Sequence, residues 1–470
     1  MTDLGDLGDL GDLGDLGDLA EQTIDLVRSA TAGEAETEVT VETTTLALTR
    51  FANSFIHQNV ADTTTSVRLR LHLDGRTATG ATTRVAGGDG LARLVERTVA
   101  AARVQPVDPG WAGLSSPAPA VSSGNVDQAT AEASPAQRAE VVRAFVDATE
   151  GLEAAGYCRT THVVAVYANS AGQHLSGATT GAAADGIART GTSDGSAHAM
   201  SVRLGDVDGT ALGAQAAAKA RTGTDPIELA PGEYEVVLEP FAAVDILLWM
   251  ALYGLNGRAV NEGRSFVRTG EQQFDDTVTI VDEPIAADAT GLPFDIEGTP
   301  KRRFVFVEHG VTRAVAHDRR TAKEAGAAGA AGAAVESTGH AVPGGEAFGA
   351  APINLLLEPA SGRVTIDDLV AEVERGILVT DFNYTRVLDP GPLVVTGLTR
   401  NGVWLVEGGK IARAVKDFRY TQSYPRALAP GAVLGRTSRA EFVPTEVDGL
   451  AYAAPALRLA SWRFTGGASG

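Results

Sequence analysis

Hydrophobic and polar residues alternate along much of the first third of the chain, which is the pattern of β-strands with one buried face. The longest regular run covers residues 66–73, where four aliphatic residues occupy every second place between basic ones. Asp74-Gly75 follows at once, and this dipeptide is typical of a two-residue hairpin turn. We therefore expect a hairpin in which residues 77–84 form the returning strand, with a further strand at residues 38–50.

Helical periodicity, with apolar residues three and four places apart, appears between these strand patterns. Ser134 and Pro135 are residue types that favour the start of a helix. The other expected elements of this half are helices at residues 20–31, 91–104, 138–154 and 211–222, and strands at residues 158–167 and 200–206. The pattern predicts an N-terminal α+β domain, residues 21–225, with a curved antiparallel sheet and helices.

The second half of the chain is richer in strand patterns than in helices. A strand at residues 233–238 leads into ten apolar residues, 246–255, which are too few to span a bilayer and predict a buried helix. Further strands are expected at residues 354–357, 394–395, 403–407 and 456–462. We expect a C-terminal β-rich domain, residues 226–470, that resembles a barrel or a sandwich.

Two segments have low complexity. Residues 3–20 repeat Asp-Leu-Gly five times and end in Asp-Leu-Ala. A three-residue period makes leucines drift around a helix, and frequent glycine lowers helix stability, so residues 1–20 are expected to form a disordered or weakly helical extension. Residues 322–335, rich in alanine and glycine, are expected to form a flexible connector.

Composition narrows the classes of function. Of the 470 residues, 44% are hydrophobic and 21% are charged, an ordinary globular balance. The single cysteine, Cys158, excludes an intramolecular disulfide and suits a reducing compartment, and the acidic N-terminus does not match a secretion signal, so we expect a cytoplasmic protein. A net charge of −20 repels phosphate backbones and anionic lipids, so neither nucleic acid nor a membrane is expected as a partner.

The residues alone do not form a known catalytic pattern. A zincin-type metalloprotease needs two histidines and a glutamate on one helix, and none of the eight histidines here is followed by glutamate. His309 and His317 with Asp318 come nearest to a cluster, without a spacing that we recognise as a ligand set. Residues 191–195 have the Gly-x-Ser-x-Gly spacing of a serine nucleophile but lack the flanking strand and helix of a nucleophile elbow, so we expect a turn there. Cys158 is expected to be a packed core thiol.

Six short motifs occur in order along the chain: RFANSFIHQN at residues 50–59, ANSAG at 168–172, STGH at 337–340, PIN at 352–354, GILVT at 376–380 and WLVEGGKI at 404–411. Each is moderately specific, and the ordered set resembles the TldD/PmbA (TldE) family over residues 20–465. The resemblance implies a two-domain fold and a dimer. In that dimer the TldD-type chain carries zinc on an HExxxH helix, with a further cysteine ligand near its C-terminus.

The region that resembles the metal helix has lost its ligands. Residues 237–257 are similar to the family's strand and metal helix, and the three key positions hold Leu248, Trp249 and Tyr253, which cannot bind zinc as a set. Residues 449–462 contain no cysteine. The resemblance therefore identifies a PmbA/TldE-like, zinc-less subunit without a cofactor of its own, whose partner is a TldD-like zinc-bearing chain.

The activity that the resemblance implies is hydrolysis of short or unfolded peptides, including leader removal, on the partner chain. A peptide would be captured as an added strand, since main-chain pairing accepts many sequences. The residues expected at the substrate channel or the subunit interface are Arg50, Asn53, His57 and Gln58.

Two other functions stay open. One is an autonomous hydrolase with an unrecognised site that uses His309, His317 or His340. The other is a non-proteolytic peptide-binding or scaffold protein.

Overall fold

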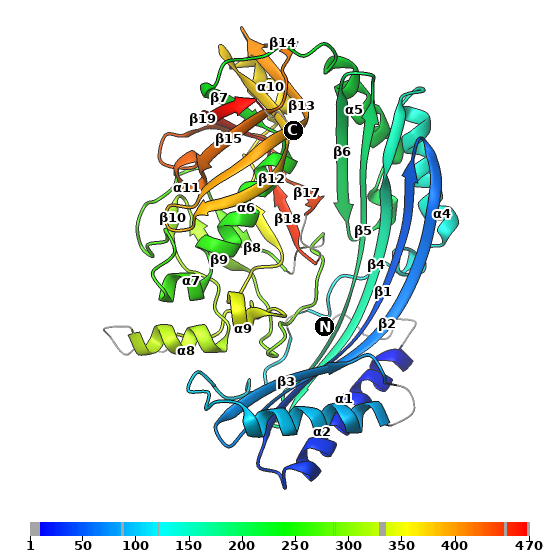
Figure 1. Ribbon diagram of the computed structural model, residues 1–470, viewed down its shortest axis with the longest axis vertical. Helices are drawn as coiled ribbons and strands as arrows, with labels where there is room; N and C mark the ends of the chain where they lie inside the picture. Colours follow the sequence, from blue (N-terminus) through cyan, green and yellow to red (C-terminus); the bar gives the residue numbers. More distant parts are fainter. Residues whose placement is uncertain are drawn as a thin grey trace.

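The fold consists of a long, curved antiparallel sheet and a β-rich C-terminal half that lies against the concave side of that sheet (Figure 1). The computed structural model describes residues 10–85, 89–120, 122–284, 286, 288–328, 335–445 and 449–467. The expected α+β fold class is confirmed, with helices gathered on the N-terminal sheet and a C-terminal half made mostly of strands.

The curved sheet is formed by neighbouring antiparallel strands from the first half of the chain. In sheet order these are β3 (Arg76–Thr82), β2 (Phe55–Leu73), β1 (Glu36–Ala52), β4 (Glu153–Asn169), β5 (His174–Arg189) and β6 (Asp194–Ser201). Asp74 and Gly75 join β2 to β3 with φ angles of 50° and 75°, the left-handed conformation at both central positions of a type I′ turn. The expected hairpin is confirmed.

Helices cover the convex face of this sheet at its two ends. They are α1 (Leu10–Ala30), α2 (Asp89–Val104), α4 (Pro135–Ala148) and α5 (Gly209–Thr222), with the short α3 (Gln128–Ala131) and a 3-10 turn (Leu204–Asp206). Ser134 caps α4 through a reciprocal hydrogen-bonded box with Gln137, as its sequence predicts. The helix expected to reach residue 154 stops at Ala148, because Glu150 and Gly151 adopt positive φ angles before β4 begins.

Helix α1 starts inside the Asp-Leu-Gly repeat. Leu16, Ala20, Ile24 and Val27 are buried against the sheet, and their spacing forms a continuous stripe on one helical face. Residues 10–20 therefore form an ordered, packed part of the helix where a disordered or weakly helical extension was expected, because tertiary burial outweighs the cost of the glycines. Residues 1–9 of the expected extension lie outside the described residues.

Strand β5 is rich in alanine and glycine and is packed closely on both faces. A Cβ atom at Gly177 would come within 2.6 Å of Pro293 from the C-terminal half, and one at Gly186 would come within 2.5 Å of the Phe145 ring on α4. Its partner β6 ends at Ser201, so the strand expected at residues 200–206 is wrong: these residues finish β6 and enter a 3-10 turn. Pairing with β5 holds a segment of low β-propensity in a strand.

The C-terminal half contains two sheets. One has the order β10 (Val311–Thr312), β9 (Phe304–Glu308), β8 (Ile280–Asp282), β11 (Leu355–Leu357), β18 (Ala451–Ala454) and β17 (Glu441–Pro444). The other has the order β12 (Arg375–Asp389), β7 (Gly232–Leu238), β19 (Leu457–Gly467), β15 (Phe418–Ser423), β13 (Val394–Glu407) and β14 (Lys410–Ala414), with β16 (Val433–Arg436) paired to β19. Because β12 also pairs with β13, the second sheet closes on itself as a barrel.

Short helices fill the space around these sheets. They are α6 (Pro240–Trp249), which continues as a π-helical turn (Met250–Gly254), α7 (Gly257–Asn261), α8 (Arg319–Ala328), α9 (Gly345–Phe348), α10 (Ile366–Ala371) and α11 (Tyr424–Ala427). Helix α8 begins at Arg319, where the Asp318 carboxylate caps it by accepting from the N–H of Thr321 at 2.7 Å. It extends through residues 322–328 of the segment that was expected to be a flexible connector. The rest of that connector includes residues 329–334, which lie outside the described residues.

The two halves of the chain are joined by direct polar contacts as well as by packing. Arg70 of β2 forms an ion pair with Glu297 at 2.9 Å, and the Gln173 amide donates to the carbonyl of Gly298 at 3.0 Å. Strand β17 lies against β5 and β6 at the other end of the seam. None of the described helices combines the length and the apolar character needed to cross a membrane.

Candidate functional site

Helix α6 is the element to which the resemblance assigns the metal ligands. Strand β7 runs straight into it, with Glu239 at the cap position and Pro240 at the first helical position, where a missing N–H costs nothing. The helix is almost entirely apolar and packs against β12 and β18. Leu248 is 5% exposed and belongs to the core of the C-terminal half, so it serves packing.

One face of α6 stays half-buried and carries Phe241, Asp245, Trp249 and Tyr253, spaced four residues apart. The Trp249 indole N–H donates to Asp245 Oδ1 at 3.2 Å, and the centroids of the Trp249 and Tyr253 rings lie 5.9 Å apart. At the start of the stripe, the Phe241 ring stacks on His198 of β6 with a centroid distance of 3.9 Å. The stripe therefore leads away from the seam between the two halves of the chain.

Asp245 is the acceptor at the centre of a group of hydroxyls. Thr385 donates to Asp245 Oδ2 at 3.2 Å, and the Tyr424 hydroxyl donates to the same oxygen. Burial and the nearby carboxylate raise the pKa of Tyr424 well above its usual value, so its hydroxyl stays protonated and donates. Tyr420 extends the group, with its hydroxyl 3.0 Å from that of Tyr424. The carboxylate of Asp245 is thus committed to neutral donors.

The side chains on and around α6 do not fit a bound zinc ion. Zinc takes nitrogen, sulfur or carboxylate ligands in a tetrahedral set. Leu248 offers hydrocarbon, Trp249 offers an N–H donor that is already used, and Tyr253 would be a single hydroxyl ligand. Among the described residues, no group of three or more histidine, cysteine, aspartate or glutamate side chains is placed to hold a metal ion.

The three histidines considered for an autonomous site do not meet at one surface. His309 is exposed in the turn between β9 and β10, with a φ angle of 47°. His317 and His340 are buried, and burial together with His340 lowers the pKa of His317 to about 4. His340 Nε2 lies 3.2 Å from Asp282 Oδ2, with both side chains 1% exposed. A substrate would have no access to this buried pair.

A polar cluster around a single histidine, His198, lies where β6 meets the barrel, and the sequence pattern did not reveal it. Ser196 Oγ lies 3.2 Å from His198 Nε2, and His198 Nδ1 lies 3.2 Å from Asp185 Oδ1, which is the connectivity of a Ser-His-Asp triad. Asp381 of β12 changes the chemistry. It accepts from Ser196 at 2.7 Å, and its other oxygen lies 3.4 Å from the same histidine nitrogen.

The charge state of His198 also excludes a triad. Burial alone would lower the pKa of His198, but Asp185 and Asp381 raise it to about 10. A charged imidazolium cannot remove a proton from Ser196, which is 0% exposed as well. The cluster is therefore an ionic clamp between the curved sheet and the barrel.

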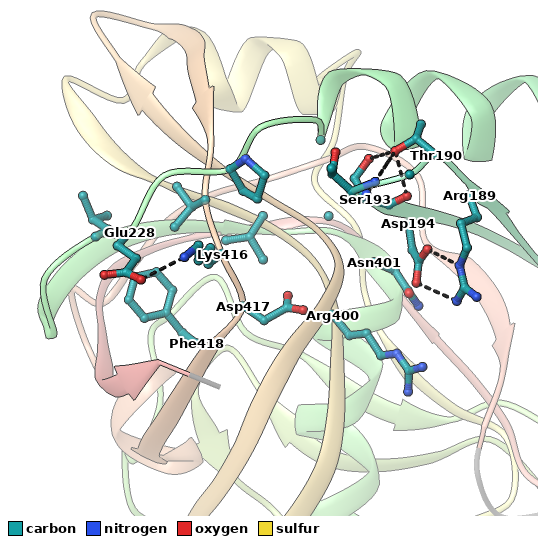
Figure 2. Close-up of a pocket in the computed structure, with 18 of the residues that line it drawn as sticks. Arg189, Thr190, Ser193, Asp194, Glu228, Arg400, Asn401, Lys416, Asp417 and Phe418 are labelled. Atoms are coloured by element: carbon teal, nitrogen blue, oxygen red, sulfur yellow. Dashed lines mark hydrogen bonds and ion pairs between the residues drawn. The ribbon is translucent and has the colours of Figure 1, made fainter. Parts of the chain in front are cut away.

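A groove of about 920 Å³ opens at the outer end of this clamp, between the turn that joins β5 to β6 and the strands β13 and β15 (Figure 2). Four of the six charged side chains that line it form pairs: Arg189 binds Asp194 through two hydrogen bonds, and Lys416 binds Glu228 at 2.8 Å. Arg400 and Asp417 are the other two. Burial raises the pKa of Asp417 to about 6. The groove is polar and largely neutralised, and Figure 2 shows no nucleophile directed at a base.

The residues expected at a channel or interface lie together at one end of the β1–β2 hairpin. Arg50 pairs with Gln58 across the two strands, and a register shift between Arg50 and Phe51 leaves His57 as an extra residue on β2. Asn53 occupies the connecting turn with a φ angle of 51°. Arg50, Asn53, His57 and Gln58 are all exposed, and their role stays a prediction.

Comparison with known proteins identifies the family. Residues 231–466, which are half of the chain, match the model of the PmbA/TldA metallopeptidase C-terminal domain. This chain belongs to the TldD/PmbA family. The match includes α6 and the strands of the barrel, so the helix to which the resemblance assigns the metal ligands lies inside the matched domain.

Relatives and solved structures agree with TldD/PmbA membership. A metalloprotease TldD homolog of Buchnera aphidicola is 25% identical over 205 residues, which are 42% of this chain and 38% of that protein. A metalloprotease of Archaeoglobus fulgidus is 40% identical over 72 residues, 15% of this chain and 16% of that protein. The chain thus aligns with less than two thirds of the length of either relative.

Similarity of fold extends over almost the whole chain. TldE from Thermococcus kodakarensis superimposes with a TM-score of 0.82 at 16% identity, covering 95% of this chain and 99% of that one. A proposed modulator of a DNA gyrase from Thermotoga maritima gives 0.79 at 19% identity, covering 95% and 100%. At these identities the likeness establishes the TldD/PmbA fold.

Proposed function

We propose that this chain is the zinc-free, TldE-like subunit of a peptidase that hydrolyses unfolded or short peptides, including leader segments, in the cytoplasm. Catalysis is assigned to a TldD-like partner that carries the zinc. The observation that supports the proposal is the state of α6. In a member of a metallopeptidase family, the positions of the metal helix hold a core leucine and two aromatic residues that contact each other.

The role left for such a chain is to shape the chamber and the path of the substrate. The half-buried stripe on α6 presents aromatic rings and a saturated carboxylate, which suit contact with another surface and not proton transfer. The ionic clamp around His198 keeps the sheet and the barrel in a fixed relation. A non-catalytic subunit would contribute a rigid surface without catalytic groups to a closed peptidase chamber.

Native mass spectrometry of the tagged chain isolated from its own cells tests the proposal, since it reports the mass of a partner and bound zinc together. A complex with a second chain of similar size and one zinc ion is the expected result. A zinc-free homodimer would refute the subunit role and favour a peptide-binding or scaffold protein. Zinc on the isolated chain would refute the assignment of catalysis to the partner.

The autonomous hydrolase is separated from this proposal by a second assay. The purified single chain is incubated with an unfolded peptide, and a Ser196→Ala variant is run beside it, because Ser196 has the triad-like contacts. We expect no cleavage by either protein. Cleavage that a chelator does not stop and that Ser196→Ala removes would instead establish a serine hydrolase.

A further inference from the structure

Strand β2 has a long free edge. Residues 55–66 pair with β1 on one side, whereas pairing with β3 on the other side begins only at Val67. Within the described part of the chain, this leaves twelve consecutive residues of β2 with one strand neighbour. Every residue from His57 to Thr64 is exposed, although the same strand is buried at alternate positions further on. The outward main-chain groups of this segment can accept another strand.

The composition of the free edge lacks the usual protection against pairing. Edge strands of soluble proteins are commonly guarded by lysine, proline or an interrupting bulge along their length. Between residues 55 and 66 there is neither lysine nor proline, Asp62 is the single acidic residue, and the bulge at His57 lies near the end of the segment. An unguarded edge of this length is a site for strand addition.

The two faces of the β1–β2 hairpin differ at this place. On the concave face, Val60 pairs with half-buried Leu48 beside Leu46, and Val60 and Leu46 are 46% and 42% exposed. On the convex face, threonine hydroxyls bond to each other across the strands: Thr43 to Thr65 at 2.9 Å, and Thr45 to Thr63 at 3.0 Å. The convex face is therefore suited to water, whereas the concave face carries a small apolar patch at Leu46, Leu48 and Val60 beside the exposed Asp62, which pairs with Leu46.

The free end of the hairpin is held firmly in place. The N–H of Ser54 donates to the carbonyl of Ala154, at 2.9 Å, and the N–H of Ala154 donates to the Ser54 hydroxyl at 3.0 Å. Phe51 and Phe145 pack beneath it with ring centroids 5.5 Å apart. An edge that is ordered before binding loses little conformational freedom when a strand is added.

We infer that the free edge of β2, residues 55–66, is the surface on which the zinc-bearing partner chain docks, through a strand added to β2 and an apolar contact at Leu46 and Val60. This inference rests on the proposed function. A resident subunit fits better than a passing peptide, because a peptide would leave an unguarded edge exposed to aggregation between turnovers. The partner thereby extends the curved sheet and places its own chain beside Arg50, Asn53, His57 and Gln58.

The test introduces charge at the edge. The double variant Val60→Lys/Thr64→Lys puts two lysines on exposed concave-face positions, and Ile411→Lys, at a 50% exposed position on the edge strand β14, is the matched control. Each is co-expressed with the TldD-like chain from the same cells. We expect the double variant to bind the partner about tenfold more weakly, or not at all, because the two lysine charges would have to lose their hydration in the interface. The control should bind as the wild type does.

Hydrogen exchange gives a readout that does not depend on a variant. Amides of residues 55–66 should exchange quickly in the isolated chain and slowly in the complex. If the wild type forms the zinc complex while these amides stay unprotected and the double variant binds normally, docking occurs elsewhere and only this inference fails. If no zinc-bearing chain associates with the wild type, the proposed function fails. Protection by a peptide alone, or by self-association, would overturn the resident partner as occupant.

Discussion

Replacing His198 by glutamine removes the cation from the ionic clamp between the curved sheet and the barrel. His198 lies between Asp185 at 3.2 Å and Asp381 at 3.4 Å, and its side chain is 8% exposed. Asp381 would keep its hydrogen bonds from Ser196 and Asn401 but would lose its main positive partner, and only Lys219 would still act on it as a cation. Removing one partner of a buried ion pair typically costs about 3–5 kcal/mol of folding free energy.

The pKa of His198 predicts a stabilisation of the folded chain of the same size, and it predicts how this stabilisation changes with pH. Its pKa in the folded chain is about 10, against a usual value of 6.5, and each unit of that difference corresponds to about 1.4 kcal/mol of stabilisation. Below pH 6.5 the imidazole is charged in the folded and the unfolded chain, so the contribution is complete, about 5 kcal/mol. It declines as the pH rises and is lost near pH 10, where the folded form also gives up its proton.

Urea unfolding of the wild type and His198→Gln, followed by circular dichroism at pH 6, 8 and 9.5, measures this effect. We expect the wild type to be more stable by about 3–5 kcal/mol at pH 6, with the difference shrinking at each higher pH. His174→Gln, at an exposed position, is the control and should change the midpoint little. A difference that is below about 1 kcal/mol, or that does not vary with pH, would refute the clamp.

Two further predictions concern buried polar groups. Asp245→Asn should lower the free energy of unfolding by about 1–3 kcal/mol, because an amide cannot accept all the hydrogen bonds that the carboxylate accepts. The same change should alter the fluorescence of Trp249, whose indole N–H donates to Asp245. Unchanged fluorescence and stability would contradict the contacts described. Burial raises the pKa of Cys158 to about 12, so a thiol reagent at pH 8 should label it only after unfolding, and rapid labelling of the native chain would show that the site opens.

The sequence predicted those elements that are determined by residues next to each other in the chain. The turn at Asp74-Gly75 requires left-handed backbone at both positions, and the cap at Ser134 satisfies helix N–H groups directly, so each signal acts within a few residues. Strands β5 and β6 were largely missed, because alanine and glycine carry little β-propensity and their extended form depends on pairing with each other and β4. Helix α1 depended in the same way on burial against the sheet.

The candidate site likewise contains features that the sequence predicted and features that arise only from tertiary contacts. The apolar character of α6 and the buried state of Leu248 followed from the sequence, since a continuous hydrophobic run predicts a core helix. The clamp could not be foreseen, because His198 and Asp381 are separated by 183 residues and meet only when the barrel is set against the sheet. Alternation in the N-terminal hairpin predicted most of β1 and residues 66–73 of β2, but it did not predict residues 55–65 as part of β2. The lack of a second strand neighbour along residues 55–66 is a property of sheet order, which periodicity does not contain.

The tight packing on β5 limits how this protein can be stabilised by engineering. A common route to greater heat resistance replaces glycine and alanine in strands by valine or isoleucine. At Gly177 the added carbon would displace Pro293 and push the C-terminal half away, and at Gly186 it would strike Phe145 and lift α4. Strand β5 therefore leaves no room for a larger side chain at these two positions, although it is the strand with the smallest residues.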